Sequence, residues 1–241
     1  MSSFMPVERS TLTSPAWFIP FDDHNRRVRS AGVTVHLDRH DNGVWVPQDA
    51  TPVRTPSGAL AFPGLGKRAQ PGTAQPQRHR ARFAAAGYQP LYPAEDQPFS
   101  ADLIGVEFLV HPHNDTNPPA VRAEPRLVRL LPAVSFSYSP GTRTVRGVVV
   151  DATTKAPVGN ALVAARGLTF HDRTPWQERT LSDATGAFRL ALRWDGERAG
   201  GEAVEETFRL SAVQRSNRTG TVLVRLPQDA GIRHVIEISE Q

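Results

Sequence analysis

Two histidines and an aspartate fall within five residues of this 241-residue sequence and could bind a metal ion. In His111-Pro-His113-Asn-Asp115, two imidazoles and a carboxylate share one turn, a donor set that suits a transition metal. Pro112 separates the two rings, however, and no further histidine cluster is placed in the sequence to complete the site. A polar turn is therefore favoured over a metal site.

A second acidic group, Asp22-Asp23-His24, could supply paired carboxylates for acid–base catalysis or for Ca²⁺. The matching place in the second half of the chain holds Asp151 followed by Ala152, with no second carboxylate. Aspartate at the end of a strand commonly bonds to the backbone of the turn that follows. A turn at the end of a strand is therefore the better interpretation of this group.

A third group, His171-Asp172 with the nearby Ser182, suggests a catalytic triad. No Gly-x-Ser-x-Gly nucleophile turn occurs in the sequence, and there is no phosphate-binding loop, dinucleotide fingerprint or cysteine. We therefore expect a protein that is not an enzyme, with no catalytic residues, no metal and no cofactor.

The four tryptophans are Trp17, Trp45, Trp176 and Trp194, and their rings could stack on sugars. Large aromatic side chains more often anchor a core or a protein interface. Trp17, Trp45 and Trp176 are therefore taken as candidate interface residues.

The elements that position these residues form a repeat. Strand-like runs end in turn signals at 145–151, 157–163 and 180–190, and a shift of 128 residues lays 21–23, 33–37 and 57–62 on the same frame without a gap. In this frame Asp151 meets Asp23, Val163 meets Val35 and Gly186 meets Gly58. The sequence therefore predicts two copies of one small β-domain.

A turn is expected at the centre of each copy. Gly186 suits a backbone with positive φ, Asp183 can cap the turn, and Phe188 then points into the core. Gly58 is the counterpart in the first copy, where Thr55 stands in place of the aspartate.

Composition agrees with an all-β protein. Apolar residues make up 39% of the chain, and 21 prolines and 18 glycines supply the turns that many short strands require. The net charge is +4, but the basic residues are nearly all arginine and mostly alternate along strands. The densest run, from Lys67 to Arg82, is predicted to be a loop, so a nucleic-acid partner is disfavoured.

The predicted organisation is an N-terminal arm over 1–15, a sandwich over 16–115, a linker that can also pair as strands over 116–143, and a second sandwich over 144–241. The N-terminus shows no secretory signal, and no run approaches the roughly 20 apolar residues of a membrane span. We therefore expect synthesis in the cytoplasm and no membrane partner.

The motifs of the second copy, Val-Arg-Gly-Val-Val-Val-Asp151, Pro-Val-Gly-Asn-Ala-Leu-Val163 and Ser-Asp183-Ala-Thr-Gly-Ala-Phe-Arg-Leu190, resemble the carboxypeptidase regulatory-like domain. That family has a transthyretin-like β-sandwich fold. The resemblance implies two tandem transthyretin-like or Ig-like Greek-key sandwiches, with about seven strands in the second. It also implies that strands B and C are joined by the Asp-x-x-Gly-x-Phe turn and that the module does no chemistry.

The run from Arg126 to Thr142, followed by such a module, is similar to proteins encoded with phage tail and contractile injection system genes. This resemblance implies a non-catalytic structural subunit at the tail end, baseplate or sheath. Its partners would be other subunits, in a symmetric homo-oligomeric ring or a decoration of a virion or tail-like particle.

Two alternatives stay open. A carbohydrate or host-surface binding module would lose glycan affinity when Trp45 or Trp176 is mutated. A hydrolase accessory or a weak hydrolase would need a site that the sequence does not reveal.

Overall fold

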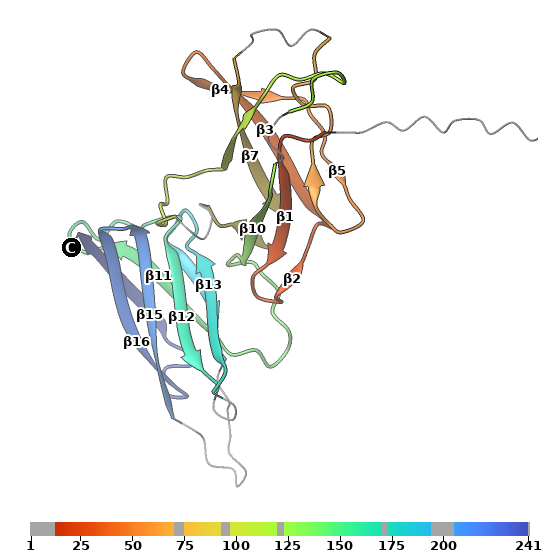
Figure 1. Ribbon diagram of the computed structural model, residues 1–241. Helices are drawn as coiled ribbons and strands as arrows, with labels where there is room; N and C mark the ends of the chain where they lie inside the picture. Colours follow the sequence, from red (N-terminus) through yellow and green to blue (C-terminus); the bar gives the residue numbers. More distant parts are fainter. Residues whose placement is uncertain are drawn as a thin grey trace, which may run out of the picture.

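The computed structural model describes residues 13–69, 75–92, 97–119, 123–169, 173–193 and 205–240. These residues form strands and turns without a helix, as the composition predicts, and Figure 1 shows two bodies joined end to end. No helix in the described ranges is long and apolar enough to cross a membrane. Most of the predicted N-terminal arm lies outside the described residues.

The first body contains the strands β1 to β10, which pair in the order β4-β3-β7-β8-β10-β1-β6-β5, with β2 beside β1 and β9 beside β7. Their bounds are β1 (Trp17–Asp22), β2 (Arg27–Val28), β3 (Val33–Asp41), β4 (Val44–Gln48), β5 (Val53–Arg54), β6 (Leu60–Ala61), β7 (Gln77–Ala85), β8 (Tyr88–Pro90), β9 (Val106–Val110) and β10 (Pro125–Pro132).

The second body contains β11 to β17, which pair in the order β13-β12-β15-β16-β17-β11-β14. Their bounds are β11 (Thr144–Asp151), β12 (Leu162–Leu168), β13 (Pro175–Leu181), β14 (Ala187–Ala191), β15 (Glu206–Arg215), β16 (Arg218–Leu226) and β17 (Arg233–Glu240). Their number agrees with the roughly seven strands that the sequence resemblance implies.

Each body is a two-layer sandwich, because alternate residues of facing strands enclose one apolar core. In the second body, Phe188 and Ile236 from the β14-β11-β17 layer pack in one cluster with Phe208 and Leu210 from the β13-β12-β15-β16 layer. In the first body, Phe18 of β1 makes edge-to-face contacts with Phe83 and Phe108 of the opposite layer. The predicted pair of tandem β-sandwiches is therefore confirmed.

The two sandwiches have matching strand connections. β1 lies between the parallel strand β10 and the antiparallel strand β6, and β11 lies in the same way between β17 and β14. β3 pairs with β4 and β7, as β12 pairs with β13 and β15.

The match also extends to residues with positive φ. Arg26 and Lys155 have φ of 55° and 58°, and Gly32 and Asn160 have φ of 71° and 55°. The first pair is 129 residues apart and the second 128. The segment from the first of these positions to the second is therefore one residue longer in the first sandwich than in the second. The gapless alignment expected from the sequence is wrong at β1, where the shift is 129 residues.

The counterpart of Asp151 is consequently Asp22 and not Asp23. Oδ1 of Asp22 accepts from the backbone N–H groups of the second and third residues that follow it, at 3.1 and 2.9 Å. Oδ1 of Asp151 accepts in the same way, at 3.0 and 2.8 Å. This turn pattern fixes the alignment, whereas the letters alone allow either aspartate.

The central turns are also alike. Gly186 has φ of 75° and Gly58 has φ of 82°. Asp183 Oδ1 accepts from the N–H of Ala187 at 3.0 Å, and Thr55 Oγ1 accepts from the N–H of Ala59 at 3.0 Å, so threonine takes over the role of the missing aspartate. Phe188 lies on β14, directly after the turn, and its side chain is buried in the core.

The Asp183 turn joins β13 to β14, the third and fourth strands of the second sandwich. It carries the chain from the β12 layer to the β11 layer. In the order of the chain, β11 to β14 are strands A to D. The turn therefore links strands C and D, and the expectation that it links strands B and C is wrong.

The sandwiches differ in one element. β16 pairs with β15 along its length and also meets β17 through its first two residues. In the first sandwich this role is divided between β8, which pairs with β10, and β9, which pairs with β7. The described chain between them, residues 91–92 and 97–105, has no counterpart among the described residues of the second sandwich.

Two further expectations change. The basic run predicted to be a loop enters β7 at Gln77, and Arg78, Arg80 and Arg82 point outward from that strand. β10 lies in the residues expected to be a linker that can also pair as strands, and it is an internal strand of the first sheet beside β1. We propose that the first sandwich extends to Pro132.

Candidate functional site at the junction of the two sandwiches

Asp23 forms the centre of the junction. Its side chain is almost fully buried, at 2% exposure. Arg179 of β13 donates to both carboxylate oxygens, at 3.0 and 2.6 Å, and Arg129 of β10 donates to Oδ1 at 2.8 Å. One carboxylate of the first sandwich is therefore shared between an arginine from each sandwich.

Glu178 provides the reciprocal contact from the second sandwich. Its side chain is 3% exposed, and its Oε2 lies 2.9 Å from Nδ1 of His24. Arg193 Nε donates to the other oxygen at 2.9 Å. Residues 178 and 179 are neighbours on β13, so their side chains point to opposite sides of the strand. Asp23 contacts Arg179 on one side, and His24 contacts Glu178 on the other.

Neutral contacts surround these ion pairs. Thr180 Oγ1 donates to the backbone oxygen of Pro132 at 2.7 Å. The ring of His24 packs edge-on against Phe136 and Tyr138, with centroids 5.7 and 5.1 Å away. Arg26 also donates to the backbone oxygen of Gln177. The junction thus combines buried charge with aromatic packing.

A second contact joins the sandwiches through residues that only the first one has. Ala101 donates its N–H to Gln214 O at 2.9 Å and accepts from Asn160 Nδ2 at 2.6 Å. Asp102 forms an exposed ion pair with Arg215, at 2.9 Å. The segment between β8 and β9 therefore reaches the second sandwich.

This arrangement fixes orientation. Burying a charge is costly unless it is paired and hydrogen-bonded, so the two sandwiches cannot separate without exposing or unpairing Asp23 and Glu178. Two contacts at different places also resist rotation about either one. The junction therefore holds the two sandwiches together as one unit.

Next to the junction, Asp22 closes its own turn. Burial raises the pKa of the Asp22 carboxyl, but hydrogen bonds from Asn25 and Tyr88 outweigh it and hold the pKa below its usual value. Tyr88 donates its hydroxyl to Asp22 Oδ2 at 2.6 Å. Burial and this hydrogen bond raise the pKa of Tyr88 to about 12.

The turn expected for the Asp22-Asp23-His24 group is formed by Asp22, whose carboxylate accepts from the N–H groups of His24 and Asn25. The sequence did not indicate that Asp23 and His24 bond to the second sandwich. Glu178 and Arg179 carry a faint signal, because two charged residues stand side by side in the middle of a short strand. Nothing in the sequence pairs them with residues about 155 positions away.

The proposed metal and triad residues are not brought together. His113 is buried while His111 is exposed, and Nδ1 of His113 lies 3.2 Å from the backbone oxygen of His111. Asp115 instead pairs with Lys67 at 2.8 Å. Within the described ranges, no three His, Asp or Glu side chains are grouped closely enough to hold a metal ion.

The third triad candidate, Ser182, is buried and used in the fold. Its hydroxyl donates to Val158 O at 2.8 Å and accepts from Ala161 N–H at 2.9 Å. His171 and Asp172 lie outside the described residues.

The tryptophans occupy different environments. Trp176 is 6% exposed and packs beside Phe208 in the second core, so its face is not open to a ligand. Trp45 is half-buried on β4, with the guanidinium of Arg80 4.5 Å from its ring centroid and His40 beside it. Trp17 is half-buried on β1. Trp194 lies outside the described residues.

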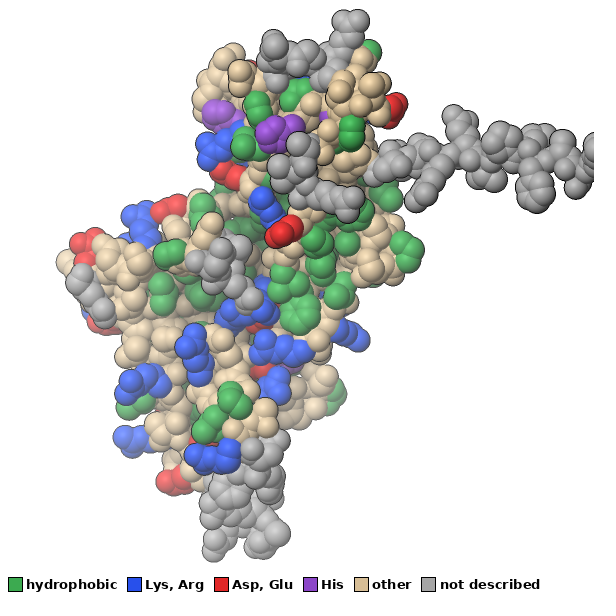
Figure 2. Space-filling model, in the orientation of Figure 1, with side chains coloured by type: hydrophobic (Ala, Val, Ile, Leu, Met, Phe, Trp, Pro, Cys, Tyr) green, Lys and Arg blue, Asp and Glu red, His purple; other side chains and the backbone are tan. Residues whose placement is uncertain are grey.

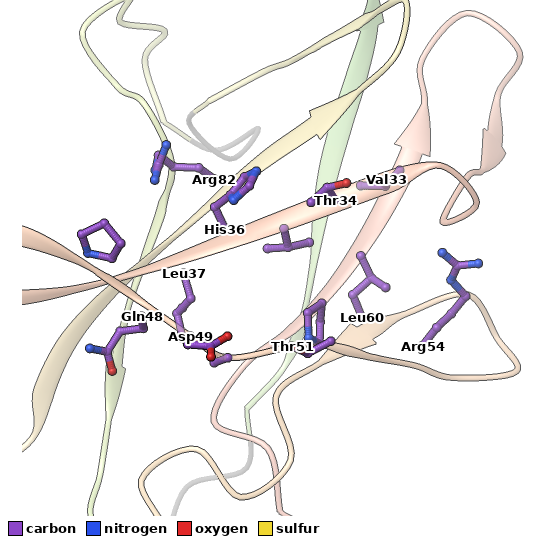
Figure 3. Close-up of a pocket in the computed structure, with 14 residues that line it drawn as sticks. Val33, Thr34, His36, Leu37, Gln48, Asp49, Thr51, Arg54, Leu60 and Arg82 are labelled. Atoms are coloured by element: carbon purple, nitrogen blue, oxygen red, sulfur yellow. The ribbon is translucent and has the colours of Figure 1, made fainter.

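A groove of about 540 Å³, lined by both polar and apolar residues, opens beside β3 in the first sandwich. Figure 3 shows His36 and Arg82 side by side on one wall, with Asp49 and Thr51 on the strand connection opposite. Arg82 is held by two hydrogen bonds to Asp38, at 2.8 and 2.9 Å. Those bonds, above all, keep the pKa of Asp38 below its usual value.

Charge is unevenly spread over the surface. In Figure 2, Lys and Arg side chains are scattered over the second sandwich, on the face where Figure 1 places β12, β15 and β16. On β7, by contrast, Arg80 and Arg82 pair with Asp38, and Arg78 pairs with Glu107. The densest basic run of the sequence is therefore largely neutralised.

Comparison with known proteins adds no family. No protein-family model and no curated protein matches the chain. Solved structures with some likeness include a streptococcal ancillary pilin, with 14% identity over 95% of this chain and 62% of that chain, at a TM-score of 0.29. The chain thus spans less than two thirds of that pilin.

Two further pilins have a similar degree of likeness. BcpA, the major pilin subunit of Bacillus cereus, has 12% identity over 94% of this chain and 69% of that chain, at a TM-score of 0.30. The shaft pilin SpaA of Lactobacillus rhamnosus GG has 13% identity over 96% of this chain and 98% of that chain, at 0.27. Scores this low carry no argument about function, so the functional conclusion depends on the geometry.

Proposed function

We propose that this chain is a non-catalytic structural subunit of a large assembly, a phage tail or contractile injection particle, in which it joins and spaces other subunits. The observation that carries the proposal is the buried Asp23–Arg129–Arg179 cluster. Separating a buried ion pair is strongly unfavourable, so this cluster holds the two sandwiches in one geometry, and a connector needs a defined geometry.

The two sequence resemblances support the same role. The second sandwich carries the turn motif of the carboxypeptidase regulatory-like domain, a module that does no chemistry in that family. The run from Arg126 to Thr142, which is similar to phage tail and injection system proteins, supplies β10 and the aromatic residues of the junction. The segment that carries the resemblance is thus the one that joins the sandwiches.

An edge of the first sandwich offers a docking surface for other subunits. β4 ends its sheet, and Val44 on this strand is 62% exposed. Val46 on β4 and Val53 on the other edge strand, β5, are exposed as well. Unpaired strand edges with apolar side chains accept an added strand from a partner.

Gentle affinity purification of the tagged chain from the organism that carries its gene tests the role directly. Mass spectrometry and negative-stain imaging of the copurified material are expected to reveal tube, sheath or baseplate proteins in tail-like particles. Recovery of a monodisperse monomer alone would contradict the proposal.

A matched pair of variants tests whether the junction matters for assembly. Arg179→Ala removes the bidentate contact to Asp23 and is expected to reduce incorporation into particles at least tenfold, because the angle between the sandwiches is no longer fixed. Arg166→Ala changes an exposed arginine on the neighbouring strand and should leave incorporation unchanged. Equal incorporation of both variants would contradict a role for the junction.

A carbohydrate-binding or host-surface module is the second candidate, favoured by the groove beside β3 and by the partly exposed Trp45 ring. A glycan array with the purified chain would show affinity that falls in Trp45→Ala or Asp49→Ala. Trp176→Ala is not informative for this purpose, because its ring lies in the core. An array without signal would remove this candidate.

A further inference from the structure

Three arginines lie side by side across the second sandwich. Arg146 on β11 is directly opposite Arg189 on β14 and directly opposite Arg233 on β17. Neighbouring strands are about 4.8 Å apart, so the three side chains leave the sheet within about 10 Å of one another. Like charges at directly opposite positions destabilise a sheet.

The fold itself does not require this row. The corresponding row of the first sandwich pairs Trp17 of β1 with Ala61 of β6 and with Pro125 of β10. The same three strand positions therefore hold Ala-Trp-Pro in one copy and Arg-Arg-Arg in the other. Because the uncharged row supports the same architecture, the charge in the second sandwich needs another explanation.

The arginine row opens into a groove of about 720 Å³ without a carboxylate in its lining. Beside the three arginines, the groove is lined by Thr144 and by apolar or small residues, among them Val134 and Ile232. Ile232 is 55% exposed. The groove therefore combines concentrated positive charge with an accessible apolar wall.

Neutral partners hold one end of the row in place. Arg189 donates to the backbone oxygen of Phe136 at 3.2 Å, and its guanidinium lies 4.9 Å from the ring centroid of Tyr138. These contacts orient the side chain without cancelling its charge. Arg146 and Arg233 form no ion pair with any residue in the described part of the chain.

We infer that this groove binds an acidic polypeptide segment of a partner, with carboxylates on the arginine row and an apolar side chain against Ile232. Guanidinium groups suit carboxylates because they donate two parallel hydrogen bonds. Bases and sugars bind on exposed aromatic faces, and the one aromatic ring in the lining, Phe188, is buried in the core. The inference names a partner for the proposed structural subunit and rests on that role.

The test uses the purified full chain and a fluorescent hexaglutamate peptide at low salt, with anisotropy as the readout. Arg146→Gln and Arg233→Gln are each expected to weaken binding about tenfold or more, the effect of losing one charge-assisted hydrogen bond. Arg209→Gln, at an exposed arginine opposite Leu223 on the other sheet, is the matched control and should stay within about twofold of the unmodified chain.

Urea unfolding of the same variants separates binding from folding. Arg146→Gln is expected to leave the midpoint unchanged or to raise it, because the substitution relieves repulsion within the row. A lowered midpoint without a change in peptide affinity would mean that the row is structural, which overturns the inference.

The remaining outcomes are equally decisive. Failure of the unmodified chain to bind the peptide overturns the inference, as does equal binding by Arg146→Gln. Tighter binding of a 12-nucleotide single strand or of a heparin hexasaccharide at the same salt would assign the groove to a nucleic acid or a glycan instead. Peptide binding by a chain that never associates with particles would contradict the structural role and leave the acidic ligand standing.

Discussion

The two sandwiches share the backbone positions that form their turns and differ where they face each other or the solvent. Arg26 matches Lys155 and Gly32 matches Asn160 in conformation, although both pairs differ in residue type. Thr55 and Asp183 accept the same hydrogen bond with different groups. The fold therefore constrains conformation and hydrogen bonding more tightly than it constrains residue type.

The differences mark positions that have acquired other roles. The first sandwich has a divided strand and the segment that holds Asp102 against Arg215. The second has the arginine row where the first has an uncharged one. The first sandwich thus serves as a reference for the second, because its uncharged row shows that this architecture does not require the three arginines.

The largest expected effect comes from breaking the junction between the copies. Asp23→Ala leaves Arg129 and Arg179 without their shared carboxylate, and loss of one member of a buried ion cluster costs about 3–5 kcal/mol. Urea unfolding should show this loss and a separation of the two sandwiches into distinct transitions. The matched change Asp102→Ala removes an exposed pair and should leave the unfolding curve unchanged. Equal effects would mean that burial of the junction is unimportant.

The next comparison concerns the central turns. Alanine at either glycine must adopt a positive φ, at a cost of about 1–2 kcal/mol. A Cβ on Gly186 would also lie 2.5 Å from the backbone oxygen of Val149, whereas on Gly58 it would meet only the side chain of Val28 closely, at 2.9 Å. Gly186→Ala should therefore cost about 3 kcal/mol or more and Gly58→Ala about half as much. Thermal unfolding of both variants checks the order, and a larger loss for Gly58→Ala would contradict it.

The smallest effect is a difference in acid sensitivity between Asp22 and Asp151. The folded-state pKa of Asp22 lies below the usual value of 3.8, so the folded protein binds fewer protons there than the unfolded chain. Its stabilising contribution is complete above about pH 4 and is lost as the pH falls through the lower folded value. Asp22→Asn should flatten the dependence of the urea midpoint on pH between 5 and 2.

Asp151→Asn is the control for that comparison. The pKa of Asp151 is also lowered, first of all by the backbone N–H of Thr154, but this carboxylate lies at the surface. A smaller flattening is expected, because solvent screens exposed groups more strongly. If Asp151→Asn flattened the pH dependence of the urea midpoint as much as Asp22→Asn does, burial of the Asp22 carboxylate would make no difference to acid sensitivity.

Much of the fold could be predicted because the strands alternate regularly and end at residues with clear turn chemistry. Asn42-Gly43 is a residue pair typical of a tight hairpin turn, and φ is 47° and 87° at these two residues between β3 and β4. The seven strands of the second sandwich follow their apolar periodicity. The Arg78–Arg82 segment was predicted wrongly, because its glycine- and proline-rich neighbours outweighed its alternation.

The junction could be predicted only in part. Asp22, Asp23 and His24 stand out in the sequence, yet their roles depend on which strand ends meet. Asp22 bonds within its own turn, while Asp23 meets Arg179 from a strand more than 150 residues later. Contacts across that distance leave no periodic signal, because either partner alone fits an ordinary surface pattern.

The sequence by itself determined the class of fold, the duplication and the turns, since these follow from local alternation and from residues that tolerate positive φ. Only the tertiary structure decided that β10 pairs with β1, that Asp23 and Glu178 hold the two sandwiches together, and that Arg146, Arg189 and Arg233 stand in one row. The physical reason is that strand pairing brings distant residues together, and the effect of a buried or clustered charge depends on neighbours that the chain order does not reveal.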